Sequence, residues 1–128
     1  MKIVSFNMNS IRARPHQLVY LRDTLDPDII GIQETKVNDP EFPVDVIKEI
    51  GYHPEYWGQK GHYGVAILSK KKPTEVQKGF IKDTAEDQKR FIQAKFKWGK
   101  KSITIMNGYF PQGENRAHET KFPKKIKY

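Results

Sequence analysis

The sequence contains no cysteine among its 128 residues. Disulfide bonds and thiolate metal sites are therefore excluded, and any bound metal must be held by oxygen or imidazole ligands. No apolar run approaches the roughly 18 residues that a membrane-spanning helix requires, and the first residues lack an apolar signal core behind a basic start. We therefore expect a protein without membrane association that stays in the reducing cytoplasm.

Internal repeats, low-complexity segments and interior linkers are also absent from the sequence. A chain of this length can form one hydrophobic core but not two, so we expect a single domain over residues 1–128. Residues 58–64 contain three glycines but lack the Walker spacing, so a plain hairpin turn explains them as well as a phosphate-binding loop does. His62 in this turn has no second histidine at ligand spacing.

Positive charge predominates in the sequence. Lysine and arginine number 23 against 15 aspartates and glutamates, which gives a net charge of +8 and a pI near 9.6. Such a charge favours a polyanionic partner, and nucleic acid is the commonest one. Because ribosomal and generic binding proteins share this composition, the motifs must decide the class of protein.

Residues 28–36, DIIGIQETK, join an apolar run to a polar end. The apolar part is typical of a strand buried on both faces of a parallel sheet. Glu34 then lies at the carboxyl end of that strand, where open α/β sheets place their ligands. The simpler interpretation is that Glu34 caps a turn or pairs with Lys36.

A strand–helix–strand unit is predicted for residues 2–34. A strand ending at Asn7 precedes a helix that opens near Pro15 and ends before Pro27, and the next strand ends at Glu34. If the two strands are parallel neighbours, Asn7 and Glu34 meet at one edge of the sheet. An amide oxygen and a carboxylate are suitable partial ligands for a hydrated Mg²⁺. A turn-forming role is the alternative for Asn7.

The rest of the pattern predicts a helix and further strands. We expect a helix over residues 44–50, an extended segment over 52–57, a strand over 65–69, a solvated basic hairpin end over 70–73, and antiparallel strands over 90–98 and 102–109. Tyr109 ends the last strand, where it is either a core-edge residue or one that presents its hydroxyl to a phosphate oxygen.

Four ordered motifs carry a family resemblance that covers essentially the whole chain. They are SFNMNSIRA at residues 5–13, GIQETK at 31–36, GQKGHYGVA at 58–66 and NGYFPQG at 107–113. With these motifs the chain resembles the amino-terminal half of a bacterial exonuclease III, in the AP endonuclease branch of the endonuclease/exonuclease/phosphatase superfamily. Ser10 stands where the family more often has glycine, a change that we expect to alter the loop little.

The resemblance implies a fold, a function and site residues. The implied fold is α/β, here the mixed-sheet half of a four-layered α/β sandwich. The implied activity is that of a DNA repair nuclease, a 3′-5′ exodeoxyribonuclease and AP endonuclease that uses Mg²⁺ or Mn²⁺ and acts on double-stranded DNA at abasic sites or 3′ ends. The implied roles are metal binding by Asn7 and Glu34, phosphate contact by the catalytic Tyr109, and DNA contact by Arg90, Gln112 and Lys121.

Family members are roughly twice as long as this chain, and their second half carries further catalytic motifs. The sequence has no aspartate beyond Asp87 and no histidine beyond His118. We therefore expect a partial domain, truncated and inactive alone, in which one sheet stands without its partner and the apolar face of residues 103–106 is uncovered. Such a face would suit a complementary carboxyl-terminal half or self-association.

Two other functions are compatible with parts of this pattern. The chain could be a non-catalytic basic DNA-binding module, or one half of a split enzyme that needs a partner chain. The phosphatase branch of the superfamily is less compatible, because the motifs QETK at residues 33–36 and YFPQG at 109–113 resemble those of the nuclease branch.

Overall fold

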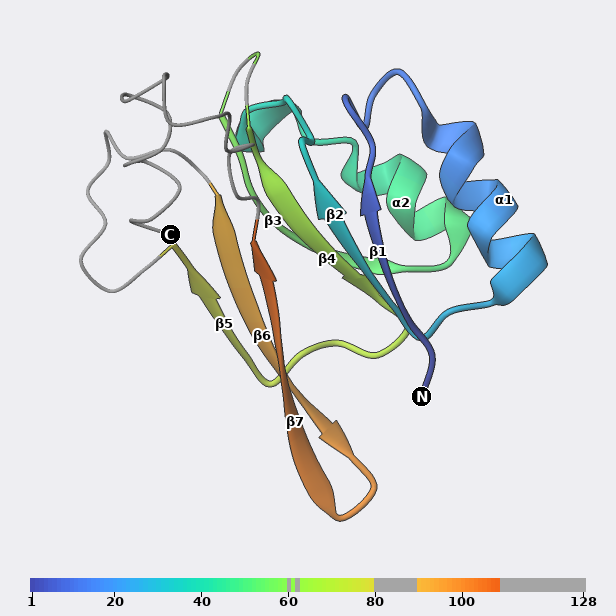
Figure 1. Cartoon of the computed structure of the whole chain (residues 1–128), viewed down its shortest axis with the longest axis vertical. Helices are drawn as coiled ribbons and strands as arrows, with labels where there is room; N and C mark the ends of the chain where they lie inside the picture. The colour runs from blue at the N-terminus through green and yellow to red at the C-terminus, as the bar shows by residue number, and fades with distance from the viewer. Residues whose placement is uncertain (60, 62, 80–89, 109–128) are drawn as a thin grey trace, which may run out of the picture.

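The computed structural model describes residues 1–59, 61, 63–79 and 90–108. Four strands form a first sheet in the order β1-β2-β4-β3, and three form a second sheet in the order β5-β6-β7. Only β1 and β2 pair in parallel among these strands. Helices α1 and α2 lie on one side of the first sheet and the second sheet lies on the other (Figure 1). The elements are β1 (Ile3–Asn7), α1 (Pro15–Leu25), β2 (Ile29–Gln33), η1 (Asp39–Glu41), α2 (Val44–Ile50), β3 (His53–Trp57), β4 (Val65–Ser69), β5 (Glu75–Lys78), β6 (Phe91–Trp98) and β7 (Lys101–Gly108).

Strand β2 is buried on both faces, as its apolar sequence predicts. Ile30 and Ile32 pack with residues of α1 and α2, whereas Ile29 packs toward the second sheet. Full burial of each of these side chains is worth about 1.5–3 kcal/mol relative to exposure. The strand that leads into Glu34 is therefore one of the best anchored in the molecule.

A second core cluster joins the two sheets. It contains Ile29, Val65, Ile67, Ile92, Ala94 and Phe96, and Ile105 packs against it. The α/β class and the mixed sheet are confirmed. The expectation that one sheet stands alone with residues 103–106 uncovered is wrong, because β6 and β7 turn their apolar face onto the first sheet. Met106 is the large β7 side chain that stays strongly exposed, at 67%.

Most of the predicted local elements are confirmed. Helix α2 covers the expected residues and ends at Gly51, which has a φ of 114°. Residues 70–73 are not a hairpin end, because β4 and β5 belong to different sheets and this segment passes between them. Strand β5 was not expected, since its short polar sequence gives little strand signal. Neither helix in the described ranges has the length and apolar character needed to cross a membrane.

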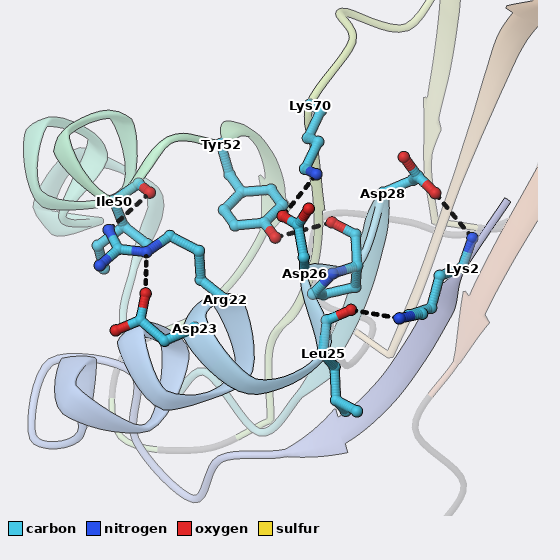
Figure 2. Close-up of polar contacts among 10 residues, drawn as sticks. Lys2, Arg22, Asp23, Leu25, Asp26, Asp28, Ile50, Tyr52 and Lys70 are labelled. Atoms are coloured by element: carbon cyan, nitrogen blue, oxygen red, sulfur yellow. Dashed lines mark hydrogen bonds and ion pairs between the residues drawn. The ribbon is translucent and has the colours of Figure 1, made fainter.

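Polar contacts fix the start of β1 and β2, at the edge away from Glu34 (Figure 2). The Lys2 backbone N–H donates to Asp28 Oδ2 at 2.7 Å, and Lys2 Nζ donates to the Leu25 carbonyl at 2.6 Å. The buried Tyr52 hydroxyl donates to the Pro27 carbonyl at 2.7 Å. Burial raises the pKa of Tyr52, which keeps this donor protonated. The register of the two strands is thus set at this end.

An ion pair at the same end ties the first α–β connection to β4. Lys70 Nζ lies 2.6 Å from Asp26 Oδ1, and this hydrogen bond holds the pKa of Asp26 below its ordinary value. Asp26 has a φ of 46°, as the left-handed cap of α1. Because both side chains are exposed, the pair orients the turn more than it stabilises the fold.

Candidate functional site

Asn7 and Glu34 come from neighbouring strand ends. Asn7 is the last residue of β1 and pairs in register with Gln33, and Glu34 follows Gln33 directly. The prediction that their strands are adjacent and parallel is confirmed. Both residues therefore lie at the carboxyl edge of the parallel pair, where α/β sheets bind ligands.

The Glu34 carboxylate has no hydrogen bond or ion pair within the described ranges, and the residue is half-buried. The simpler interpretation paired it with Lys36, but Lys36 Nζ donates instead to Asn9 Oδ1. Neither carboxylate oxygen of Glu34 is among the fully buried, unpaired side-chain atoms of the described residues, so the group keeps access to solvent. A carboxylate at a strand edge that is not committed to another side chain can bind a hydrated cation.

Asn7 has a local role as well. Its Oδ1 accepts the backbone N–H of Asn9 at 3.1 Å, which is the turn-forming contact that the alternative interpretation predicts. A carbonyl oxygen has two lone pairs, and this contact uses one of them. Asn7 is exposed, so the same oxygen is still accessible to a ligand.

Three loops meet at Glu34, and two of them hold the backbone of the third, which contains Glu34 itself. The loop after β1 supplies the N–H of Ser10, which donates to the Glu34 carbonyl at 2.8 Å. The loop between β3 and β4 accepts the N–H of Thr35 at the Gly64 carbonyl (3.2 Å) and the N–H of Lys36 at the Tyr63 carbonyl (2.9 Å). Glu34 is therefore held from both sides by backbone hydrogen bonds.

The same three loops contain most of the unusual backbone angles. Positive φ angles occur at five non-glycine residues here: Asn9 (50°), Ser10 (95°), Glu34 (57°), Lys36 (55°) and Tyr63 (57°). Residues in this conformation are costly and persist only where the surrounding structure imposes them, which is often the case at functional sites. The strain is an observation that supports a functional role for this edge.

Two glycines allow the β3–β4 loop to approach the segment after Glu34. A Cβ atom on Gly64 would lie 2.0 Å from Thr35 Oγ1, and one on Gly58 would lie 2.2 Å from the Val37 carbonyl oxygen. Both distances are too short for real atoms. Gly58 and Gly64 therefore serve close packing, and the turn connects the antiparallel pair β3 and β4, as the hairpin interpretation of its sequence predicts.

Ser10 adopts a backbone conformation that glycine adopts at less cost. We expect Ser10→Gly to raise the free energy of unfolding by about 1 kcal/mol, because glycine has no Cβ to crowd the backbone at positive φ. Urea unfolding of the 128-residue chain measures the change. Ser10→Ala keeps the Cβ and is the matched control, and equal stability of the two variants would contradict the strain.

The sequence matches a known protein family over the region that forms the candidate site. Residues 4–105 match the Endonuclease/Exonuclease/phosphatase family, a match that includes β2, β1 from its second residue onward, and both residues of the candidate edge. The chain belongs to the endonuclease/exonuclease/phosphatase family.

Curated relatives of this family are similar over most or all of the chain. Exodeoxyribonuclease III of Haemophilus influenzae is 52% identical over 128 residues, which is 100% of this chain and 48% of the relative. Exodeoxyribonuclease of Bacillus subtilis is 35% identical over 87% of this chain and 43% of its own. The chain thus spans about half the length of the curated relatives that it matches.

Solved structures of the endonuclease/exonuclease/phosphatase family share the fold. An AP endonuclease from Archaeoglobus fulgidus superposes with a TM-score of 0.85 at 38% identity, over 99% of this chain and 47% of that one. A 3′ phosphatase from Neisseria bound to a product DNA hairpin gives 0.79 at 30% identity, over 100% and 51%.

Of the remaining predicted site residues, only Arg90 lies within the described ranges, where it packs against Tyr63 of the loop between β3 and β4. Arg90 is 2% exposed, and its guanidinium carbon lies 4.5 Å from the centroid of the Tyr63 ring. Contact of Arg90 with DNA stays a prediction. Tyr109, Gln112 and Lys121 fall outside the described ranges.

Within the described ranges, no group of three or more histidine or acidic side chains could hold a metal ion. Asn7 and Glu34 thus fit a hydrated cation only as part of a ligand set.

No role was predicted from the sequence for Asn107, although it lies in the motif at residues 107–113. Its signal was a polar residue at an inward-facing position of an otherwise apolar strand face.

Proposed function

We propose that this chain carries one part of the active site of a DNA repair nuclease that hydrolyses phosphodiester bonds. The proposed cofactor is Mg²⁺ or Mn²⁺, and the proposed substrate is double-stranded DNA at abasic sites or 3′ ends. The observation that carries the proposal is the half-buried Glu34 carboxylate, which has no partner within the described ranges, beside Asn7 at the end of two parallel strands. The names of the exodeoxyribonuclease relatives support the same chemistry.

The oxygen ligands fit the proposed metal. Glu34 supplies one carboxylate and Asn7 one amide oxygen, and Mg²⁺ takes one or two protein carboxylates beside water and substrate phosphate. A bound divalent cation supplies Lewis-acid stabilisation of the phosphate and of the leaving oxygen. Glu34 would hold the cation at a strand end whose backbone is fixed by hydrogen bonds from the two neighbouring loops.

Positive charge and the remaining motif residues complete the proposal. The net charge of +8 attracts the phosphate backbone without regard to sequence. We assign phosphate contact to Tyr109 and backbone contacts to Arg90, Gln112 and Lys121, in line with their motif positions. Residues 1–128 would form a partial domain, and a carboxyl-terminal half would supply the groups that activate water.

A joined enzyme tests the proposal. It is a single chain in which residues 1–128 precede the carboxyl-terminal half of the Haemophilus influenzae relative. We expect it to cut duplex DNA carrying an abasic site in the presence of Mg²⁺, to lose this activity in EDTA, and the 128-residue chain alone to show none. Fluorescent duplexes with an abasic site or a recessed 3′ end give the readout.

Two outcomes would contradict the proposal. A folded joined enzyme that binds DNA in a salt-dependent way but never cuts it would identify a binding module instead. EDTA-sensitive cutting by the 128-residue chain alone would show that its own residues complete the site.

A further inference from the structure

Asn107 is a buried polar residue on the inner face of β7. It pairs in register with Ile92, so it faces the first sheet among apolar neighbours, and it is 6% exposed. Its Nδ2 donates to the Ile32 carbonyl at 2.9 Å and to the Ala66 carbonyl at 2.8 Å. One carboxamide thus bridges β7 to two strands of the other sheet.

The oxygen of the same carboxamide extends the bridge. Gln33 Nε2 donates to Asn107 Oδ1 at 2.6 Å and also lies 3.1 Å from Ser5 Oγ on β1. Both N–H bonds of the carboxamide donate hydrogen bonds and its oxygen accepts one, so every polar atom of the Asn107 side chain has a partner. The hydrogen bonds connect β7, β2 and β1 next to the edge that holds Asn7 and Glu34.

Gly31 provides the room for this side chain. A Cβ on Gly31 would lie 3.3 Å from Asn107 Cγ and from Oδ1, which is closer than most real contacts. Gly31 has no positive φ, so its backbone does not require glycine. The close approach of Asn107 therefore explains why a residue without a side chain lies at position 31.

We propose that Asn107 is a positioning residue that sets the relative placement of the two sheets at the candidate site. It lies two residues before Tyr109, and its partner Gln33 lies one residue before Glu34. The bridge would therefore fix the placement of β7 against the strand end that carries the proposed metal carboxylate. This inference rests on the proposed function for its catalytic consequence and on the contacts alone for its structural one.

The structural arm of the test uses the 128-residue chain, which has no cysteine to compete with labelling. Cysteines at the exposed positions Lys48, on α2, and Met106, on β7, carry nitroxide labels. Double electron–electron resonance then gives the distance distribution between β7 and the helix that covers the far side of the first sheet. We expect Asn107→Leu to broaden or shift this distribution. Ile105→Val, on the same strand but outside the bridge, is the control and should leave it unchanged.

The catalytic arm uses the joined enzyme. Asn107→Leu should lower kcat by about 10- to 100-fold with KM for DNA within about threefold, because misplacement of reacting groups affects the chemical step more than binding. Gly31→Ala crowds the carboxamide while keeping it, and should show the same defect in milder form. Ile105→Val should keep kcat.

An unchanged distance distribution in Asn107→Leu would overturn the inference, and so would a kcat that follows only the folded fraction of each variant. If the joined enzyme without substitutions were inactive, the proposed function would fail, while the distance measurement would still decide whether Asn107 fixes the two sheets.

Discussion

The joined enzyme carrying Glu34→Gln is expected to lose about 10³-fold in kcat/KM for Mg²⁺-dependent cutting of abasic-site DNA. The substitution removes one negative charge and keeps the size of the side chain. It should also keep the backbone contacts of Glu34, since the Ser10 N–H donates to the main-chain carbonyl and not to the carboxylate. The loss would therefore come from the carboxylate itself.

Two measurements separate loss of the metal site from loss of the fold. Glu49→Gln removes an exposed carboxylate from α2, far along the chain from the strand ends, and should leave kcat/KM unchanged. Thermal unfolding of both variants should stay close to that of the parent. If kcat/KM of the Glu34→Gln enzyme stayed within about threefold of the parent value, Glu34 would not be a metal ligand, since a ligand carboxylate contributes far more than this.

Gly64→Ala is expected to destabilise the 128-residue chain by about 3–4 kcal/mol, which is large for a single methyl group. Two effects add at this position. Its φ of 92° is unfavourable for alanine, and the new Cβ would lie 2.0 Å from the hydroxyl oxygen of the buried Thr35. Urea unfolding followed by tryptophan fluorescence measures the change.

The same loop provides a matched control. Gly61 also has a positive φ, 80°, but an added Cβ would meet nothing within 4 Å. Gly61→Ala should therefore cost only about 1 kcal/mol. Adding Thr35→Ala to Gly64→Ala should recover part of the loss, because the clash is relieved and the backbone strain is not. Equal costs for the two glycines would refute the proposed contact with Thr35.

The sequence predicted the elements whose signal is local. The apolar run before Glu34 predicts the strand β2. Pro15 predicts the start of α1, and Gly51 predicts the end of α2, each within a few residues. The adjacency of β1 and β2 followed from the short strand–helix–strand connection. These features predict from the sequence alone that Asn7 and Glu34 lie at one edge of the sheet.

Features that depend on distant contacts could not be predicted in this way. The alternation in β6 showed that Ile92, Ala94 and Phe96 share a buried face, but not that the first sheet covers it. The bridge from Asn107 to Ile32 joins residues 75 positions apart. The contact between Lys36 and Asn9 depends on two loops that both adopt positive φ.

The crowding of left-handed residues at one edge has a consequence for how this protein can be improved. Five non-glycine residues there cost on the order of 1 kcal/mol each, which together approach the lower end of the 5–15 kcal/mol that stabilises a typical domain. Glycine at several of these positions would be a direct route to a more heat-resistant protein. It would also give the backbone beside Glu34 more freedom, so thermostability gained here would trade against the stiffness on which a metal site depends.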